Sequence, residues 1–257
     1  MTAPILEARQ VGFAYRGSPA TLADVSIGVP AGRAVALVGE SGAGKTTLLH
    51  LLLGLKRPTS GQVLFDGNVV EPRDRAWMRT FRRHVQTVFQ DPYSSLDPRQ
   101  RVDRIIAEPI HSLGLVRRGG SRAETAQRVA AALDVVGLPE DAARRYPHEF
   151  SGGQRQRIAI ARAIVCEPRV LLADEPVSAL DVSTRARIVD LLAELRDSRG
   201  LTIVMVSHDL AVVATLCSYT AVLERGRIVE QGDTAQVLGS PRHPYTRRLI
   251  AGVPRLP

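Results

Sequence analysis

Residues 36–55 read ALVGESGAGKTTLLHLLLGL, in which a short apolar run meets a cluster of glycines and continues into a leucine-rich segment. Glycine weakens both helices and strands, so three glycines between two regular elements need a local reason. Eight consecutive residues match the phosphate-loop pattern G-x-x-x-x-G-K-[ST], where such a loop belongs, between an expected strand and an expected helix. They are Gly39, Glu40, Ser41, Gly42, Ala43, Gly44, Lys45 and Thr46.

This pattern predicts a binding site for nucleotide phosphates. Glycines allow successive backbone N–H groups, through to that of Thr47, to point at phosphate oxygens, and the following helix adds its positive N-terminal end. We expect Lys45 to reach the β- and γ-phosphates and the hydroxyl of Thr46 to ligate Mg²⁺. The alternative, a flexible glycine loop, does not account for the lysine and threonine at these positions.

A second segment supplies the acidic groups that nucleotide hydrolysis needs. Residues 170–176 read VLLADEP, an apolar strand that delivers Asp174 and Glu175 to its C-terminal end. We expect Asp174 to hold Mg²⁺, through water, and Glu175 to act as the general base. Two acids after a strand could otherwise cap a loop, and the phosphate loop favours the catalytic interpretation.

A third segment, residues 150–163, reads FSGGQRQRIAIARA and places a second anion-binding helix start in the chain. One nucleotide does not need two such helix starts. Together with the first two motifs, this segment resembles the ATP-binding cassette (ABC) ATPases over nearly the whole chain. The resemblance implies that four residues bind the γ-phosphate of ATP held by an opposite subunit: Ser151, Gly152, Gly153 and Gln154.

The resemblance extends to four further positions, each weak evidence alone but in the family's order. Tyr15, in VGFAYRG, matches the aromatic residue that stacks on adenine, although it could be an ordinary strand residue. Gln90, in TVFQDP, matches the glutamine that senses Mg²⁺ and the attacking water. Asp181, in SALD, matches a residue near the dimer interface, and His208, in VMVSHD, matches the histidine that contacts the γ-phosphate.

The order of elements predicts an α/β fold in one nucleotide-binding domain, residues 1–257. Residues 5–38 read as short strands, and Asp66-Gly67 is a hairpin signal. Residues 48–55 and 184–198 read as helices around a parallel sheet, and Ser121 with Glu124 forms a capping-box pattern. The resemblance implies a P-loop NTPase (RecA-like) core, an N-terminal antiparallel β subdomain and an inserted α-helical subdomain at about residues 91–165.

Composition narrows the function classes. The 257 residues are 44% hydrophobic and 23% charged, with no apolar run long enough to cross a membrane and no secretion leader at residues 1–10. The net charge is +8, but the arginines are scattered among acidic residues and aromatic residues are only 4%, which argues against a stacking platform for single-stranded nucleic acid. Cys166 and Cys217 are far apart, as expected for buried thiols rather than metal ligands.

Within the ABC ATPases, the chain is similar to the dipeptide, oligopeptide and nickel importer ATPases, of the second-ATPase type. The similar segments are residues 88–102, 144–164, 173–188 and 240–250, and the last includes His243-Pro244-Tyr245-Thr246. The insert is short, without a long coiled coil or zinc cysteines, and only one cassette is present, which disfavours chromosome, repair and translation members. An exporter, a phosphonate-type system or a soluble nucleic-acid-linked ATPase remain alternatives.

The resemblance implies ATP and Mg²⁺ as cofactors and a place on the cytoplasmic face of the cell membrane. The expected partners are transmembrane permease subunits, a second ABC ATPase and, indirectly, an extracytoplasmic substrate-binding protein, with no nucleic acid. A sister heterodimer is favoured over a homodimer. Many relatives carry a C-terminal extension whose cysteines bind an iron–sulfur cluster, and these cysteines do not occur before Pro257, so no cluster is expected.

Overall fold

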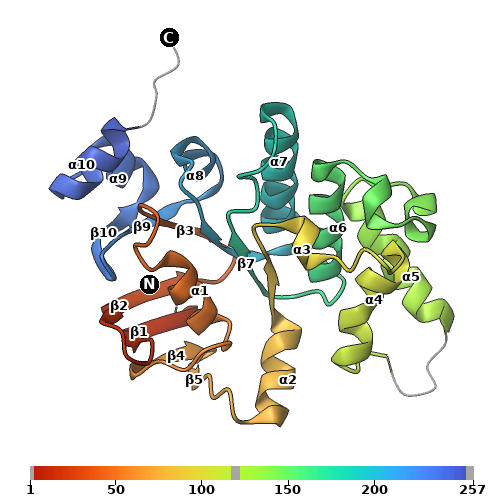
Figure 1. The fold of residues 1–257 in the computed structure, drawn as a ribbon, viewed down its shortest axis with the longest axis horizontal. Coiled ribbons are helices and arrows are strands. Elements are labelled where there is room, and N and C mark those ends of the chain that lie inside the picture. The colour runs from red at the N-terminus through yellow and green to blue at the C-terminus, as the bar shows by residue number, and fades with distance from the viewer. Residues whose placement is uncertain (1–2, 117–121, 253–257) are drawn as a thin grey trace.

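A computed structural model describes residues 3–116 and 122–252 (Figure 1). Its centre is a six-stranded sheet in the order β10-β9-β3-β8-β7-β6, in which β9 and β10 are antiparallel and the other neighbours are parallel. The strands are β3 (Ala34–Val38), β6 (Val85–Val88), β7 (Val170–Asp174), β8 (Thr202–Val206), β9 (Tyr219–Glu224) and β10 (Arg227–Asp233). The predicted parallel α/β sheet is therefore confirmed.

The sheet is covered on both faces, as its nearly continuous apolar strands require. Side chains alternate between two hydrophobic cores, so that Ala36 belongs to one core and Leu37 to the other. The first core contains α6 (Gly152–Ile164), α7 (Val182–Arg199) and α8 (Leu210–Leu216). The second contains α1 (Lys45–Leu52) and the antiparallel sheet, and Figure 1 shows the two sets on opposite sides of the strands.

The N-terminal part forms the predicted antiparallel sheet, in the order β2-β1-β4-β5. Its strands are β1 (Pro4–Ala14), β2 (Ala20–Pro30), β4 (Ser60–Phe65) and β5 (Asn68–Val69). Asp66 and Gly67, both with positive φ, turn the chain between β4 and β5, so the predicted hairpin is confirmed. The helix α2 (Arg75–His84) then leads into β6.

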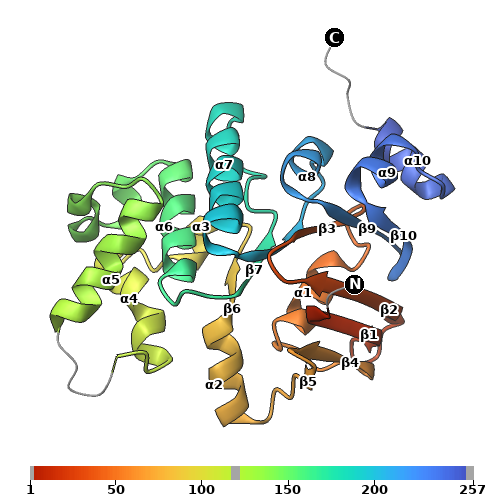
Figure 2. The same ribbon diagram turned by 180° about the vertical axis from the view of Figure 1, so that it is seen from behind.

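Every regular element between β6 and β7 is helical in the part of this segment that the structure describes. The elements are α3 (Pro92–Ser95), α4 (Val102–Ser112), α5 (Arg122–Val135), two 3₁₀ turns (Glu140–Arg144 and Pro147–Glu149) and α6. Figure 2 shows α4 and α5 at one end of the molecule, away from the antiparallel sheet. The predicted capping box at Ser121 lies outside the described residues.

Two helices have other limits than the sequence pattern predicts. The helix expected at 48–55 begins at Lys45 and ends at Leu52, because the phosphate loop leads directly into it and Gly54 adopts φ +63°. The helix expected at 184–198 spans Val182–Arg199, because Asp181 caps its start. The chain closes with α9 (Thr234–Gly239) and α10 (Pro244–Ala251). Among the described residues, no helix combines the length and apolar character that a membrane crossing demands.

Candidate nucleotide site

The phosphate loop, residues 39–46, joins β3 to α1, as the sequence predicts. Gly39, Gly42 and Gly44 have positive φ values of 154°, 80° and 104°. A Cβ atom on Gly39 would lie 2.2 Å from the carbonyl oxygen of Leu223, so only glycine fits there. Among the described residues, no side chain caps the start of α1 at Gly44, so the N–H groups of its first turn are left for a ligand. The helix therefore offers its positive end to an anion.

Lys45 lies inside this loop. Its side chain is buried, and Nζ donates hydrogen bonds of 2.8 Å to the carbonyl oxygens of both Gly39 and Glu40. Burial lowers the pKa of Lys45, while the nearby carboxylates of Glu175 and Asp174 act in the opposite direction. The ammonium group is thus held by the backbone at the start of the loop.

The side-chain oxygens of Thr46, in the first turn of α1, and Asp174, at the end of β7, lie close together. The hydroxyl of Thr46 lies 3.5 Å from Oδ1 of Asp174, which is buried at the end of β7. Burial raises the pKa of Asp174, and the charge of the adjacent Glu175 adds to this rise. A hydroxyl and a carboxylate suit Mg²⁺, which binds few protein oxygens and takes its remaining ligands from water and phosphates. These residues fit the expected ion.

Glu175 lies between Gln90 and His208, although the three residues come from the ends of three strands. The amide nitrogen of Gln90 donates to Oε2 of Glu175 at 3.0 Å, and Nδ1 of His208 lies 3.2 Å from Oε1. Glu175 has φ +45°, a strained conformation for a residue with a side chain, and its N–H donates to the carbonyl oxygen of Val206 at 2.9 Å. Strain held in this way by a neighbouring strand is typical of functional positions.

Ser151–Gln154 form the signature segment at the start of α6. Ser151 and Gln154 satisfy each other, because the hydroxyl of Ser151 accepts the N–H of Gln154 at 3.3 Å and the N–H of Ser151 donates to Oε1 of Gln154 at 3.0 Å. Within the described chain, no hydrogen bond or ion pair joins this segment to the phosphate loop. A Cβ atom on Gly153 would lie only 2.1 Å from Cγ2 of Thr184.

Thr184 belongs to the first turn of α7, which Asp181 caps. Oδ1 of Asp181 accepts the N–H of Thr184 at 3.0 Å and the hydroxyl of Ser183 at 2.7 Å. These hydrogen bonds hold the pKa of Asp181 well below its usual range. The signature segment therefore packs against the helix start that Asp181 caps, and no hydrogen bond or ion pair among the described residues joins either of them to Lys45.

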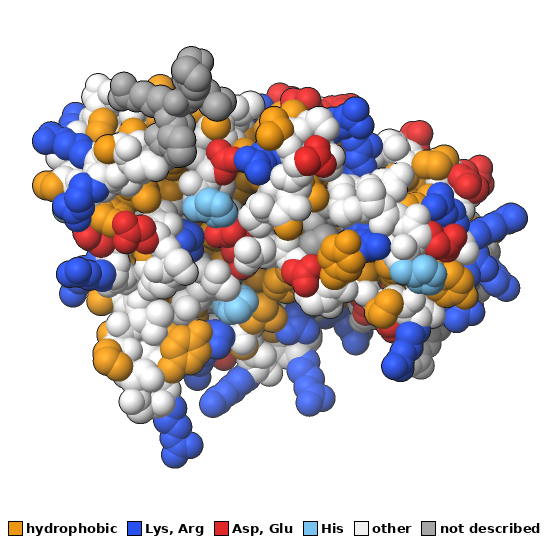
Figure 3. Space-filling model, turned by 45° about the horizontal axis from the view of Figure 1, so that its top comes forward, with side chains coloured by type: hydrophobic (Ala, Val, Ile, Leu, Met, Phe, Trp, Pro, Cys, Tyr) orange, Lys and Arg blue, Asp and Glu red, His pale blue; other side chains and the backbone are white. Residues whose placement is uncertain are grey.

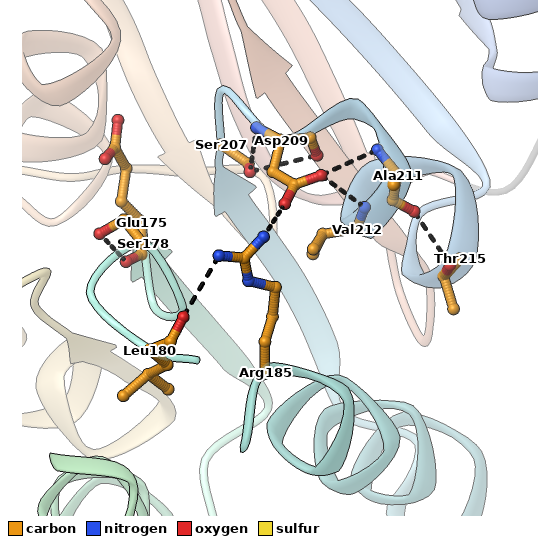
Figure 4. Close-up of polar contacts among 9 residues, drawn as sticks. All are labelled: Glu175, Ser178, Leu180, Arg185, Ser207, Asp209, Ala211, Val212 and Thr215. Carbon is orange, nitrogen blue, oxygen red and sulfur yellow. Dashed lines mark hydrogen bonds and ion pairs between the residues drawn. The ribbon is translucent and has the colours of Figure 1, made fainter. Parts of the chain in front are cut away.

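Arg185 links this helix start to the loop that carries His208 (Figure 4). Its guanidinium forms a 2.6 Å ion pair with Asp209 and donates to the carbonyl oxygen of Leu180 at 3.2 Å. Asp209 also caps α8 by accepting the N–H groups of Ala211 and Val212. The sequence motifs did not predict a role for Arg185 or Asp209. Only the position of Asp209 directly after His208 could have drawn attention to the pair.

Tyr15 lies at the edge of the site and is exposed. Its hydroxyl is 3.4 Å from that of Thr47 on α1, and its ring contacts Phe13 edge to face at a centroid distance of 4.9 Å. Nζ of Lys56 lies 4.4 Å from the ring centroid. The tyrosine is thus positioned beside the first turn of α1, next to the phosphate loop.

Comparisons with known proteins agree with this geometry. Residues 22–178 match the family model described as ABC transporter. A Brucella ovis protein, named provisionally as a peptide import ATP-binding protein, is 46% identical over 254 residues, which are 98% of this chain and 79% of the relative.

Two solved structures share the fold. The structure of CbiO1 from Clostridium perfringens, part of the ABC transporter complex CbiONQ, superposes with a TM-score of 0.83 at 30% identity and covers 93% of this chain and 92% of that one. The dimeric ATP-binding cassette MJ0796, bound to ADP and Pi, has a TM-score of 0.79 at 29% identity and covers 89% and 98%. The chain belongs to the ABC transporter family of ATP-binding proteins.

Proposed function

We propose that this chain is the ATP-hydrolysing subunit of a membrane importer for dipeptides or oligopeptides. The observation that carries the proposal is the position of Glu175, which Gln90 and His208 hold from two sides beside a complete phosphate loop. The Brucella relative named for peptide import supports the peptide class of cargo over nickel.

The catalytic residues divide the work between binding and proton transfer. Glu175 takes the proton of the water that attacks the γ-phosphate, while Gln90 orients that water and His208 contacts the γ-phosphate. Lys45 neutralises the charge that develops on the phosphate oxygens. Thr46 and Asp174, together with Gln90, would hold Mg²⁺, which would supply positive charge to offset that of the phosphate oxygens.

The remaining site residues hold the nucleotide. Tyr15 stacks on the base, and the signature segment with Asp181 acts on the nucleotide of a second subunit. The separation of this segment from its own phosphate loop supports such a paired arrangement, as does the dimeric state of MJ0796. The phosphate contacts come from the loop and the first turn of α1: Gly39, Glu40, Ser41, Gly42, Ala43, Gly44, Lys45, Thr46 and Thr47.

The proposed assembly places the chain on the cytoplasmic face of the membrane. Its second subunit is a sister ABC ATPase rather than a copy of itself, and the helical segment at about residues 91–165 contacts the permease. A substrate-binding protein acts on the outer side, without touching this chain. In Figure 3, acidic side chains lie among basic ones over the upper and middle parts of the face, which supports a partner other than nucleic acid, although basic side chains predominate along its lower edge.

Glu175→Gln tests the proposal. The variant keeps the shape of the side chain but replaces one acceptor oxygen by an amide NH₂ donor and cannot accept the proton, so hydrolysis is expected to fall by about 10²–10⁴-fold while Mg-ATP binding persists. The measurements are phosphate release by the reconstituted transporter and ATP binding by calorimetry. Glu194→Gln, at an exposed position of α7, is the matched control. Phosphate release by Glu175→Gln at the rate of the unmodified chain would refute the assignment of Glu175 as the general base.

A further inference from the structure

The motif His243-Pro244-Tyr245-Thr246 has no part in the site described above, yet each residue has a defined role at the start of α10. Nδ1 of His243 accepts the N–H of Tyr245 at 3.3 Å and caps the helix, and Pro244 occupies its first turn. Tyr245 is only 3% exposed and Thr246 is fully buried. The motif therefore builds a short, firmly docked helix.

The start of α10 is also tied to the central sheet. The carboxylate of Glu230, on β10, accepts the backbone N–H groups of Arg242 at 2.8 Å and His243 at 3.0 Å. In Figures 1 and 2, α9 and α10 lie together beyond β9 and β10 at the same end of the molecule. These contacts fix the place from which the side chain of Tyr245 extends.

The hydroxyl of Tyr245 reaches the phosphate loop. It accepts the backbone N–H of Glu40, the second residue of the loop, at 2.9 Å. The carbonyl oxygen of the same residue accepts Nζ of Lys45 at 2.8 Å and the N–H of Ala43 at 3.2 Å. Tyr245 thus binds the backbone N–H of Glu40 from outside the loop, while Lys45 binds its carbonyl oxygen from inside the loop.

We propose that Tyr245 is a positioning residue for nucleotide binding, which keeps the phosphate loop in its binding shape. This inference rests on the proposed function. Without the hydroxyl, the partly buried N–H of Glu40 loses its hydrogen-bond partner. The backbone of the first half of the loop then becomes more mobile, and ordering it again costs part of the free energy of nucleotide binding. Tyr245 touches neither Glu175 nor the Thr46–Asp174 pair, so the effect falls on affinity rather than on the chemical step.

Tyr245→Phe in the full chain tests this inference, because it removes the hydroxyl and keeps the ring that packs in the core. The dissociation constants of Mg-ATP and Mg-ADP are both expected to rise by about two- to tenfold. Hydrogen exchange at the amide of Glu40 is expected to accelerate in the same variant. Tyr219→Phe is the matched control, since Tyr219 is half-buried on β9 and its hydroxyl has no hydrogen-bond partner in the described chain.

The outcomes separate this inference from the proposed function. If the unmodified chain binds no Mg-ATP, the proposed function fails. If it binds Mg-ATP and Tyr245→Phe binds equally well, the positioning role is refuted. A shift of the unfolding midpoint without a change in affinity or in Glu40 exchange would assign Tyr245 a purely structural role and would also overturn the proposal.

Discussion

Gly152 and Gly153 are adjacent in the signature segment, but the structure predicts different responses to one added methyl group. A Cβ atom at Gly152 would meet only Cδ2 of Leu180, at 3.8 Å, which is an ordinary contact. At Gly153 it would lie 2.1 Å from Cγ2 of Thr184, closer than two carbon atoms can approach. The perturbation is therefore Gly153→Ala, with Gly152→Ala as a control on the same helix turn.

The magnitude follows from two opposing terms. Alanine in a helix is favoured over glycine by about 0.5–1 kcal/mol, and both variants gain this term. Overpacking costs Gly153→Ala about 1–3 kcal/mol, because α6 or the side chain of Thr184 must move. The free energy of unfolding of Gly153→Ala should therefore lie about 1–3 kcal/mol below that of Gly152→Ala. For a chain of this size the difference corresponds to a midpoint lower by about 2–12 °C.

Thermal and urea unfolding of the free chain measure this difference. Thr184→Ser provides a rescue, since it removes the methyl group and keeps the hydroxyl and the N–H that Asp181 caps. In the Thr184→Ser background, Gly153→Ala should lose most of its penalty. Equal stability of the two alanine variants, or a penalty that Thr184→Ser leaves unchanged, would refute the steric argument.

Two further predictions concern the Arg185–Asp209 ion pair and the two buried cysteines. Arg185→Met should lower the free energy of unfolding by about 1–3 kcal/mol and reduce turnover without weakening ATP binding, because it removes the bonds to Asp209 and Leu180. The control is Arg187→Met, at an exposed position of the same helix. Equal effects of the two variants would contradict the linking role of Arg185. Burial raises the pKa values of Cys166 and Cys217 to about 12, so neither thiol should react with Ellman's reagent at pH 8 until the chain unfolds. The pKa values of the two thiols are higher in the folded chain than in the unfolded one, so their contribution to the free energy of unfolding is complete below about pH 8.5 and falls as the pH rises. Immediate reaction of the native chain with the reagent would contradict the burial of the thiols.

The sequence alone predicted the fold class, the local form of the loop at residues 39–46, and the position of Asp174 and Glu175 at the end of a strand. The phosphate loop is a contiguous segment whose chemistry depends on local backbone freedom and on one helix start, so residues 39–46 predict it without knowledge of distant contacts. Alternation of strands and helices likewise predicted the parallel sheet. The predicted limits of α1 and α7 were less accurate, because α1 already begins at Lys45, within the loop, and Asp181 caps its helix at a position that apolar periodicity does not mark.

Only the tertiary structure decided which of these residues meet. Gln90 and Glu175 are 85 residues apart and share a hydrogen bond because β6 and β7 are neighbours in the sheet. Tyr245 and Glu40 are 205 residues apart, and α10 joins them only after it docks beside the sheet. The difference between Gly152 and Gly153 depends on α7, which the local sequence does not place. The physical reason is that local propensity fixes elements, whereas apolar burial between distant elements fixes the contacts of their side chains.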